Sequence, residues 1–167
     1  MNGNVQVRNP KIRFAGLQDL SLVLSFIKAL ADYEHLADEV RATEESLRDI
    51  LFERRVAESV IAELNGEAVG FAVIYYSLST FIGKPGLFIE DLFVRPETRG
   101  MGVGKKILAF LAQLAKERGC WGLEWSCLDW NDASIRFYEG IGAVPRPGWT
   151  IYRLCDDALN CLADTTK

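Results

Sequence analysis

Few residues in this sequence are suited to binding a metal or building a disulfide framework. Its 167 residues include four cysteines and a single histidine, His35. The cysteines, at positions 120, 127, 155 and 161, show no Cys-x-x-Cys spacing, so a structural zinc site is not expected. We expect reduced thiols, a cytoplasmic protein and a functional site without a metal.

An excess of positive charge and long apolar runs are also missing. The formal net charge is -4 at pH 7, whereas nucleic-acid binding calls for a basic surface. No apolar run approaches the roughly 20 residues that span a bilayer, and residues 1–10 lack the apolar core of a signal peptide. Nucleic acid and membranes are therefore not expected as partners.

Apolar residues, in contrast, are plentiful. They make up 49% of the chain, which is enough for one domain with a sizeable core. We predict a disordered or extended N-terminus at 1–10, one domain at 11–155 and a loosely held tail at 156–167.

Periodicity and turn residues predict the elements of this domain. Asp19 and Thr43 stand where two helices would begin, and Asn65-Gly66 predicts a type I′ hairpin turn. We expect strands at 11–15, 56–64, 67–77, 87–94, 121–128 and 149–154, a loop at 79–86, and helices starting near 19 and 43, at 103–117 and after Asn131 or Asp132. This order predicts an α+β or mixed α/β fold with one sheet flanked by helices.

A glycine-rich turn is the most informative motif. The residues Arg99-Gly100-Met101-Gly102-Val103-Gly104-Lys105 separate the apolar run 87–94 from the amphipathic stretch 103–117. Alternate glycines leave the backbone bare, so amide groups can converge on an anion at the start of a helix, where the macrodipole favours negative charge. The turn predicts a ligand that carries phosphate, and a purely structural helix cap is the alternative.

Two familiar phosphate loops do not match these residues. A Walker A loop requires glycine and Ser or Thr at the positions of Arg99 and Lys106, and the dinucleotide fingerprint requires glycine at Lys105. The turn instead resembles the R/Q-x-x-G-x-G/A signature of the GCN5-related N-acetyltransferases (GNAT), in which it binds the pyrophosphate of acetyl-CoA. The resemblance implies acetyl-CoA as co-substrate and a mostly antiparallel sheet whose neighbouring central strands splay apart.

Further segments resemble the diamine (spermidine/spermine) and thialysine acetyltransferases of that family. They are residues 29–34, 69–72, 81–84, 89–94 and 130–138. The resemblance implies an enzyme that moves an acetyl group from acetyl-CoA to a primary amine of a small molecule, namely a diamine, a polyamine or a thialysine-like amino acid. It implies direct attack in a ternary complex, and a homodimer.

Two proton-transfer residues follow from the resemblance. At pH 7, removing the proton from an alkylammonium of pKa about 10.4 costs about 4.6 kcal/mol, so a base is needed. Glu90 matches the family's base, which acts through water. Asp91 follows it, but adjacent residues of a regular strand point to opposite faces. Tyr138 matches the acid that protonates the leaving thiolate. Without the match, Glu90 would be a solvent-facing or ion-paired residue and Tyr138 a packing residue.

The resemblance also implies the binding residues. The pantetheine would contact the backbone of Leu92, Phe93 and Val94, and the pyrophosphate that of Arg99, Gly100, Met101, Gly102, Val103, Gly104 and Lys105. Asn131 and Ser134 match further cofactor contacts, although both also suit a plain helix cap. The amine site would include Tyr33, Glu34 and Glu90, of which the first two could equally be solvated residues at a helix end.

The acceptor amine is left open by one departure from the family pattern. In the polyamine enzymes an acidic residue precedes the aromatic-Ile-Gly-Lys stretch, whereas here Ser79 and Thr80 precede Phe81. Loss of a carboxylate favours smaller amines over a long dication. A protein or peptide N-acetyltransferase and a non-catalytic acyl-CoA sensor are the alternatives.

Overall fold

The computed structural model describes residues 9–166. Residues 1–8 of the N-terminal segment predicted at 1–10 therefore lie outside the described residues. The chain forms two compact units, Met1–Leu128 and Asp129–Lys167. The single domain at 11–155 stays a prediction.

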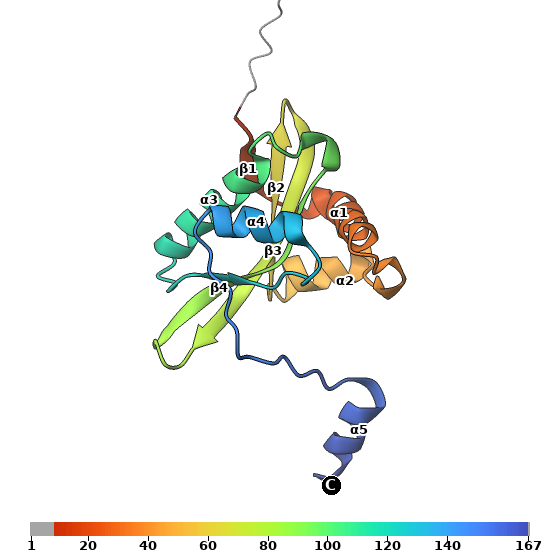
Figure 1. The fold of residues 1–167 in the computed structure, drawn as a ribbon. Coiled ribbons are helices and arrows are strands. Elements are labelled where there is room, and N and C mark those ends of the chain that lie inside the picture. The colour runs from red at the N-terminus through yellow and green to blue at the C-terminus, as the bar shows by residue number, and fades with distance from the viewer. Residues whose placement is uncertain (1–8, 167) are drawn as a thin grey trace, which may run out of the picture. The chain divides into compact units, whose positions relative to one another are not determined.

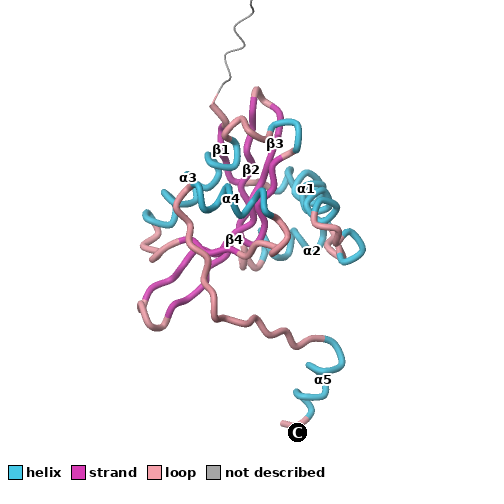
Figure 2. Tube along the Cα trace, in the orientation of Figure 1, coloured by secondary structure: helices cyan, strands magenta, loops and turns pink. Residues whose placement is uncertain are grey.

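The first unit is built on one five-stranded sheet. Its strands are β1 (Lys11–Phe14), β2 (Glu58–Leu64), β3 (Glu67–Ser79), β4 (Lys84–Val94) and β5 (Leu123–Trp125), and they lie side by side in that order. The first four are labelled in Figure 2. The first four strands pair antiparallel, and β5 pairs parallel with β4. The predicted fold class and its mostly antiparallel sheet are confirmed.

Helices cover both faces of this sheet (Figure 1). They are α1 (Leu20–Tyr33) and α2 (Glu44–Arg48, continued by a π-helix at Asp49–Glu53) on one side, and α3 (Val103–Glu117) on the other. Phe71 packs with the α1 and α2 residues, whereas a Cβ atom at the adjacent Gly70 would lie 3.4 Å from Ile107 of α3. Because neighbouring strand residues point to opposite faces, these two contacts place the helices on opposite sides.

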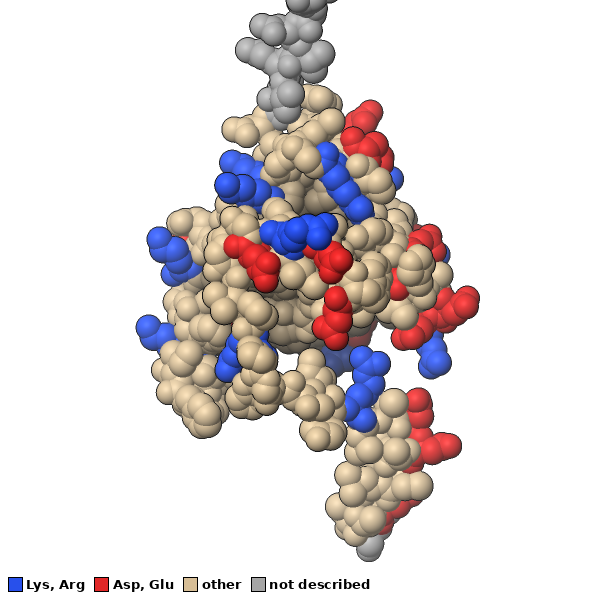
Figure 3. All heavy atoms as spheres, in the orientation of Figure 1, with Lys and Arg blue, Asp and Glu red and all other residues tan. Residues whose placement is uncertain are grey.

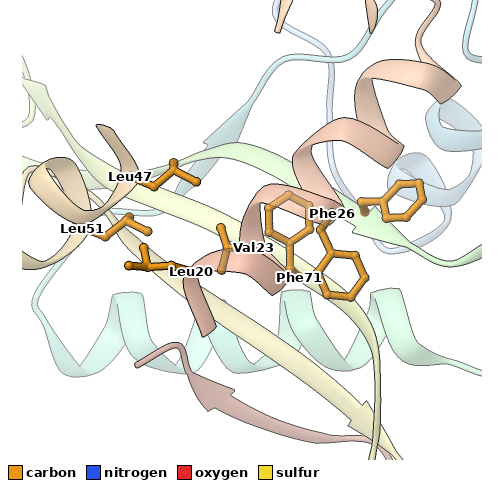
Figure 4. Close-up of a cluster of buried hydrophobic side chains, with 7 residues drawn as sticks. Leu20, Val23, Phe26, Leu47, Leu51 and Phe71 are labelled. Carbon is orange, nitrogen blue, oxygen red and sulfur yellow. The ribbon is translucent and has the colours of Figure 1, made fainter. Parts of the chain in front are cut away.

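The core beneath α1 and α2 fixes their position against the strands. Phe26 of α1 stacks on Phe71 of β3 with ring centroids 5.2 Å apart, and it lies 6.3 Å from Phe93 of β4. The cluster, six of whose members are labelled in Figure 4, consists of Leu20, Val23, Phe26, Leu47, Leu51, Phe71 and Phe93. Burial of such side chains stabilises the fold by about 1.5–3 kcal/mol each, so α1 is held firmly beside β4.

The predicted helix starts are confirmed in part. Thr43 caps α2, its hydroxyl accepting a hydrogen bond from the Ser46 amide at 3.1 Å. Asp19 stands at the N-cap position of α1, but its carboxylate does not cap that helix. It accepts bonds from Arg13 at 2.7 and 3.0 Å and from the Gly16 amide at 2.7 Å. The charge-assisted pair with Arg13 replaces the expected cap.

The loop predicted at 79–86 is wrong in extent, because β3 reaches Ser79 and β4 begins at Lys84. Pro85 enters the strand as its second residue, where it serves as an acceptor: its carbonyl receives the Trp121 amide at 2.9 Å. Gly86 lies where a Cβ atom would approach Ser77 and Trp121 to 2.6 and 2.8 Å. Both turn-forming residues therefore belong to the sheet.

The second unit contains α4 (Asp132–Gly140) and α5 (Asp156–Asp164). The strand predicted at 149–154 is wrong, and its residues form irregular chain. The described part of this unit contains no strand. The tail predicted from 156 begins with helix α5. The strand predicted at 121–128 shrinks to the three residues of β5.

Side chains of both charges are interspersed on the face drawn in Figure 3. Among residues 9–166, no helix is long and apolar enough to cross a membrane.

Candidate active site

Strand β4 loses one of its two neighbours halfway along. Its pairing with β5 covers only Leu87, Phe88 and Ile89, whereas its pairing with β3 continues to Val94. Within the described residues, the β5 side of β4 therefore has no strand partner from Glu90 to Val94. This is the splay that the resemblance implied, and it leaves backbone groups on this side of β4 without a strand partner.

Glu90 is the extra residue of a β-bulge at the start of this unpaired segment. Val73 of β3 pairs with Asp91, but the next residue, Ile74, pairs with Ile89, so Glu90 has no partner in the register. Since Val73 and Ile74 point to opposite faces, Ile89 and Asp91 do so too. The alternation expected from the sequence is therefore interrupted at Glu90. Bulges of this kind change the direction in which a side chain points.

The bulge brings carboxylates together at the α1 face of the sheet. Asp91 is half-buried, and burial, followed by the charges of Glu90 and Glu34, raises its pKa to about 6. Burial also raises the pKa of Glu34, which follows the last residue of α1. Tyr75 of β3 lies near the same group, since burial and the charge of Glu90 raise its pKa. Three carboxylates thus form a negative site that suits a cationic substrate.

The glycine turn has the geometry of an anion site. Gly100 and Gly102 have φ angles of 78° and 80°, and a Cβ atom at either would meet nothing within 4 Å. The positive φ, rather than crowding, is what requires glycine here. The first intrahelical bond at this end runs from the Lys106 amide to the Gly102 carbonyl at 3.0 Å, so the preceding amides have no acceptor in the helix.

Charges at the start of α3 support an anionic ligand. The first turn holds Lys105 and Lys106, both exposed, and no acidic residue. Helices usually place acidic residues there to complement the macrodipole. A first turn that combines lysines with unpaired amides is instead suited to a bound phosphate.

The residues present fit acetyl-CoA. The unpaired edge of β4 leads through the 3₁₀ turn Pro96–Thr98 into the glycine turn, so a row of backbone groups ends at an anion site. Leu92, Phe93 and Val94 lie on that edge, and the predicted pyrophosphate residues surround the start of α3. The structure brings these two groups and the carboxylates together within the first unit.

The remaining predicted residues of the first unit lie at its margins. Tyr33 ends α1, and Glu34 follows it beside the carboxylate group. Ser79 ends β3 and Thr80 begins the connection to β4, where Phe81 is 97% exposed. The departure from the polyamine pattern therefore lies at the tip of the β3–β4 hairpin.

Asn131, Ser134 and Tyr138 belong to the second unit, on or beside α4. Asn131 is the helix cap, because its side-chain oxygen accepts a hydrogen bond from the Ser134 amide at 3.2 Å. Of the two predicted candidates, Asn131 and Asp132, the cap is therefore Asn131. Ser134 and Tyr138 are four residues apart and so share one face of the helix. The Tyr138 ring lies 5.4 Å from that of Phe137.

Asp91 is the residue that sequence reasoning missed. The expectation of regular alternation assigned it to the face away from Glu90, and the bulge invalidates that argument. Two adjacent acidic residues inside an otherwise apolar strand were the available signal. Perturbed pKa values of this kind are concentrated at functional sites, and Asp91 therefore joins the candidate residues.

Within residues 9–166, no three His, Cys, Asp or Glu side chains gather in a way that could hold a metal ion. None of the four cysteines, all of which lie within the described residues, forms a disulfide.

Comparison with known proteins identifies the family of this fold. The model of the acetyltransferase (GNAT) family matches residues 25–143. The chain is 36% identical over 164 residues to the thialysine N-epsilon-acetyltransferase of Bos taurus, covering 91% of this chain and 96% of that protein. It is also 38% identical over 93 residues to the L-ornithine N5-acetyltransferase of Arabidopsis thaliana, covering 56% and 41%.

Solved structures agree with the sequence matches. An integron cassette protein from the mobile metagenome of V. cholerae superposes with a TM-score of 0.76 at 27% identity, covering 92% of this chain and 97% of that one. Shared sequence along most of the chain, the splayed strands and the glycine turn at a helix start lead to the same conclusion: the chain belongs to the acetyltransferase (GNAT) family and is an N-acetyltransferase, for which acetyl-CoA is the family's acetyl donor.

Proposed function

We propose that this enzyme acetylates the terminal primary amine of a small molecule, by direct attack in a ternary complex with acetyl-CoA. The candidate acceptors are diamines, polyamines and thialysine-like amino acids. Acetyl-CoA supplies the acetyl group as an activated thioester. The proposal rests chiefly on one observation, the carboxylates Glu34, Glu90 and Asp91 at the point where β4 parts from β5.

The charge of this group suits an amine that arrives as an ammonium ion. Opposite charges a few ångströms apart favour the ionised form of both partners, so a bound ammonium would lower the pKa of Asp91 from about 6. Glu34, at the end of α1, would add a second negative charge. The site would therefore concentrate alkylammonium ions beside the cofactor edge.

Glu90 is the proposed base. An ammonium ion is not nucleophilic, so a carboxylate must take its proton, directly or through water. Glu90 is exposed and is the first residue of β4 beyond the pairing with β5, and its bulge position frees it from regular alternation. Asp91 is more buried and is proposed to anchor the ammonium.

Tyr138 is the proposed acid, which would donate its phenolic proton to the sulfur of the leaving thiolate. We expect Tyr138→Phe to lower kcat about a hundredfold while the Kd of CoA changes less than threefold, because only the proton donor is lost. Tyr152→Phe, at a tyrosine that is 90% exposed in the same unit, is the matched control. Undiminished kcat in Tyr138→Phe would remove the assignment.

The hairpin tip favours a compact acceptor. Ser79 and Thr80 provide no carboxylate there, and the Ser79 hydroxyl accepts the Ile82 amide at 3.3 Å. The relatives named for thialysine and ornithine act on amino acids that carry a terminal amine. We therefore propose such amino acids, or short diamines, ahead of spermidine and spermine.

A thiol-release assay with acetyl-CoA tests the function across thialysine, ornithine, short diamines, spermidine and peptides. The expected result is the highest kcat/KM for a terminal-amine amino acid or a short diamine. Peptides as the best acceptors would replace the proposal with a protein-modifying enzyme. CoA binding without turnover on any amine would indicate an acyl-CoA sensor.

A homodimer is proposed as the working form. Four large apolar side chains near the tip of the β3–β4 hairpin support it, with exposed fractions between 52% and 97%: Tyr76, Leu78, Phe81 and Ile82. Light scattering at micromolar concentration tests the proposal, and a monomer mass would contradict it.

A further inference from the structure

Two arginines of the segment joining β4 to α3 lie on aromatic rings of α1. The guanidinium of Arg95 is 5.0 Å from the ring centroid of Phe26, and that of Arg99 is 4.5 Å from Tyr33. Phe26 and Tyr33 are seven residues apart, which places them on one face of the helix, two turns from each other. The cofactor segment is therefore attached to α1 at two points along its length.

These two contacts differ in what they support. Phe26 is 1% exposed and belongs to the core that already fixes α1. Tyr33 is the last residue of α1, and the chain then turns at His35 with a φ angle of 62°. The contact with Arg99 therefore acts at the end of the helix, next to Glu34.

The side chain of Arg99 is itself held in place. Its Nε donates to the Val94 carbonyl at 3.1 Å, and its guanidinium also lies 5.8 Å from the ring of Phe93. The backbone of Arg99 opens the glycine turn, while its side chain reaches back to β4 and α1. One residue thus contacts the cofactor turn, the unpaired edge of β4 and the helix end beside the carboxylates.

We propose that Arg99 is a positioning residue that ties the end of α1 to the cofactor turn, so that CoA binding and amine binding strengthen each other. This inference rests on the proposed function, since it needs an amine site at Glu34 and Asp91. The physical basis is conformational entropy. A ligand that fixes the turn also fixes Tyr33 and Glu34 through Arg99, so the second ligand binds with a smaller entropy cost.

Arg99→Lys and Tyr33→Leu are the informative variants. Lysine keeps the positive charge but loses the planar stack and the fixed Nε donor, and leucine keeps an apolar side chain without a ring face. A cation–π contact at a partly exposed site corresponds to about a three- to fivefold change in an equilibrium constant. We expect each variant to raise both the Kd of CoA and the amine KM by that factor, with kcat changed less than twofold.

Three comparisons make the role specific. The double variant Arg99→Lys with Tyr33→Leu should be no worse than either single variant, because both remove the same contact. Tyr33→Phe keeps the ring and should raise the Kd of CoA less than Tyr33→Leu does. Arg95→Lys is the control at the other arginine, and both constants should stay within twofold.

The measurements are isothermal titration with CoA alone and steady-state kinetics with the best amine of the thiol-release assay. If the wild type bound no CoA, the proposed function itself would fail. A different result is possible with a wild type that binds CoA and acetylates the amine. If Arg99→Lys then raised only the Kd of CoA, and raised it equally in the Tyr33→Leu background, Arg99 would act on the phosphate directly. That result, or an unchanged amine KM, would overturn the linkage.

Discussion

Segments 87–89 and 90–94 belong to the same strand, β4, but differ in their backbone pairing and burial. Residues Leu87, Phe88 and Ile89 pair with strands on both sides, and Leu87 and Ile89 are 1% and 2% exposed. Residues 90–94 pair with β3 alone, and a bulge separates them from the first half. The comparison shows that one strand is paired on both sides in its first segment and on one side only in its second, and that the change occurs at Glu90.

The largest effect is expected at Gly102, in the glycine turn that follows β4. Gly102→Val should lower the affinity for acetyl-CoA more than a hundredfold, because a branched side chain cannot readily adopt φ near 80° and would fill the space before the amides. Gly83→Val is the matched control, since Gly83 has φ of 70° and open space at the hairpin tip. Titration calorimetry should show a loss only for Gly102→Val, and equal Kd values in both variants would contradict the phosphate turn.

The next test separates the two halves of β4 by stability. Leu87→Ala should lower the free energy of unfolding by about 3 kcal/mol, because it leaves a cavity in a closed core. Leu92 is only half-buried, and Leu92→Ala should cost about 1 kcal/mol. Urea unfolding measures both, and equal losses would mean that the second half is core as well.

Glu90→Gln should lower kcat/KM about a hundredfold at pH 7 without changing the Kd of CoA, since it removes the base and keeps the shape. The loss should shrink as the pH approaches the amine pKa of about 10, because the free amine then needs no base. Glu67→Gln, at an exposed position at the start of β3, is the control. A loss independent of pH would argue against a proton-transfer role.

The smallest effect concerns Asp91 and pH. Because its folded pKa of about 6 lies above its ordinary 3.8, the folded state binds the proton more tightly, and stability falls as the pH rises from about 4 to about 6. Asp91→Asn should therefore be more stable by about 2 kcal/mol at pH 7 and nearly equal to the wild type at pH 4. Thermal unfolding across that range checks the sign.

The same substitution has an effect on catalysis. Protonation of Asp91 removes a charge from the amine site, so the wild-type amine KM should rise as the pH falls below about 6. Asp91→Asn should have a higher amine KM throughout and lack that rise. A rise that persists in the variant would assign the titration to another group.

Local patterns were enough for much of the fold. Thr43 and Asn131 cap their helices as their types indicate, and the Asn65-Gly66 turn has the φ angles of 55° and 87° that a type I′ turn requires. The conformation of the glycine turn is equally local, because glycines at fixed spacing before a helix define its backbone. Such features depend on neighbours along the chain and can be predicted without knowing the fold.

Long-range pairing explains the features that were missed. The bulge at Glu90 arises from the register between β3 and β4, and it is what places Asp91 on the α1 face. Residues 149–154 have the pattern of a strand, yet they form irregular chain, because a local pattern does not by itself specify a pairing partner. The contact between Arg99 and Tyr33 joins residues 66 positions apart, and no periodicity signals it.

By itself the sequence determined the fold class, the glycine turn and the family, because each is encoded in local periodicity or in a short motif with a fixed spacing. Only the tertiary structure decided where the pairing of β4 with β5 ends, which carboxylates lie near that point, and which side chain links α1 to the glycine turn. These depend on backbone register and on desolvation by distant segments, and both are set when the sheet and its helices pack together.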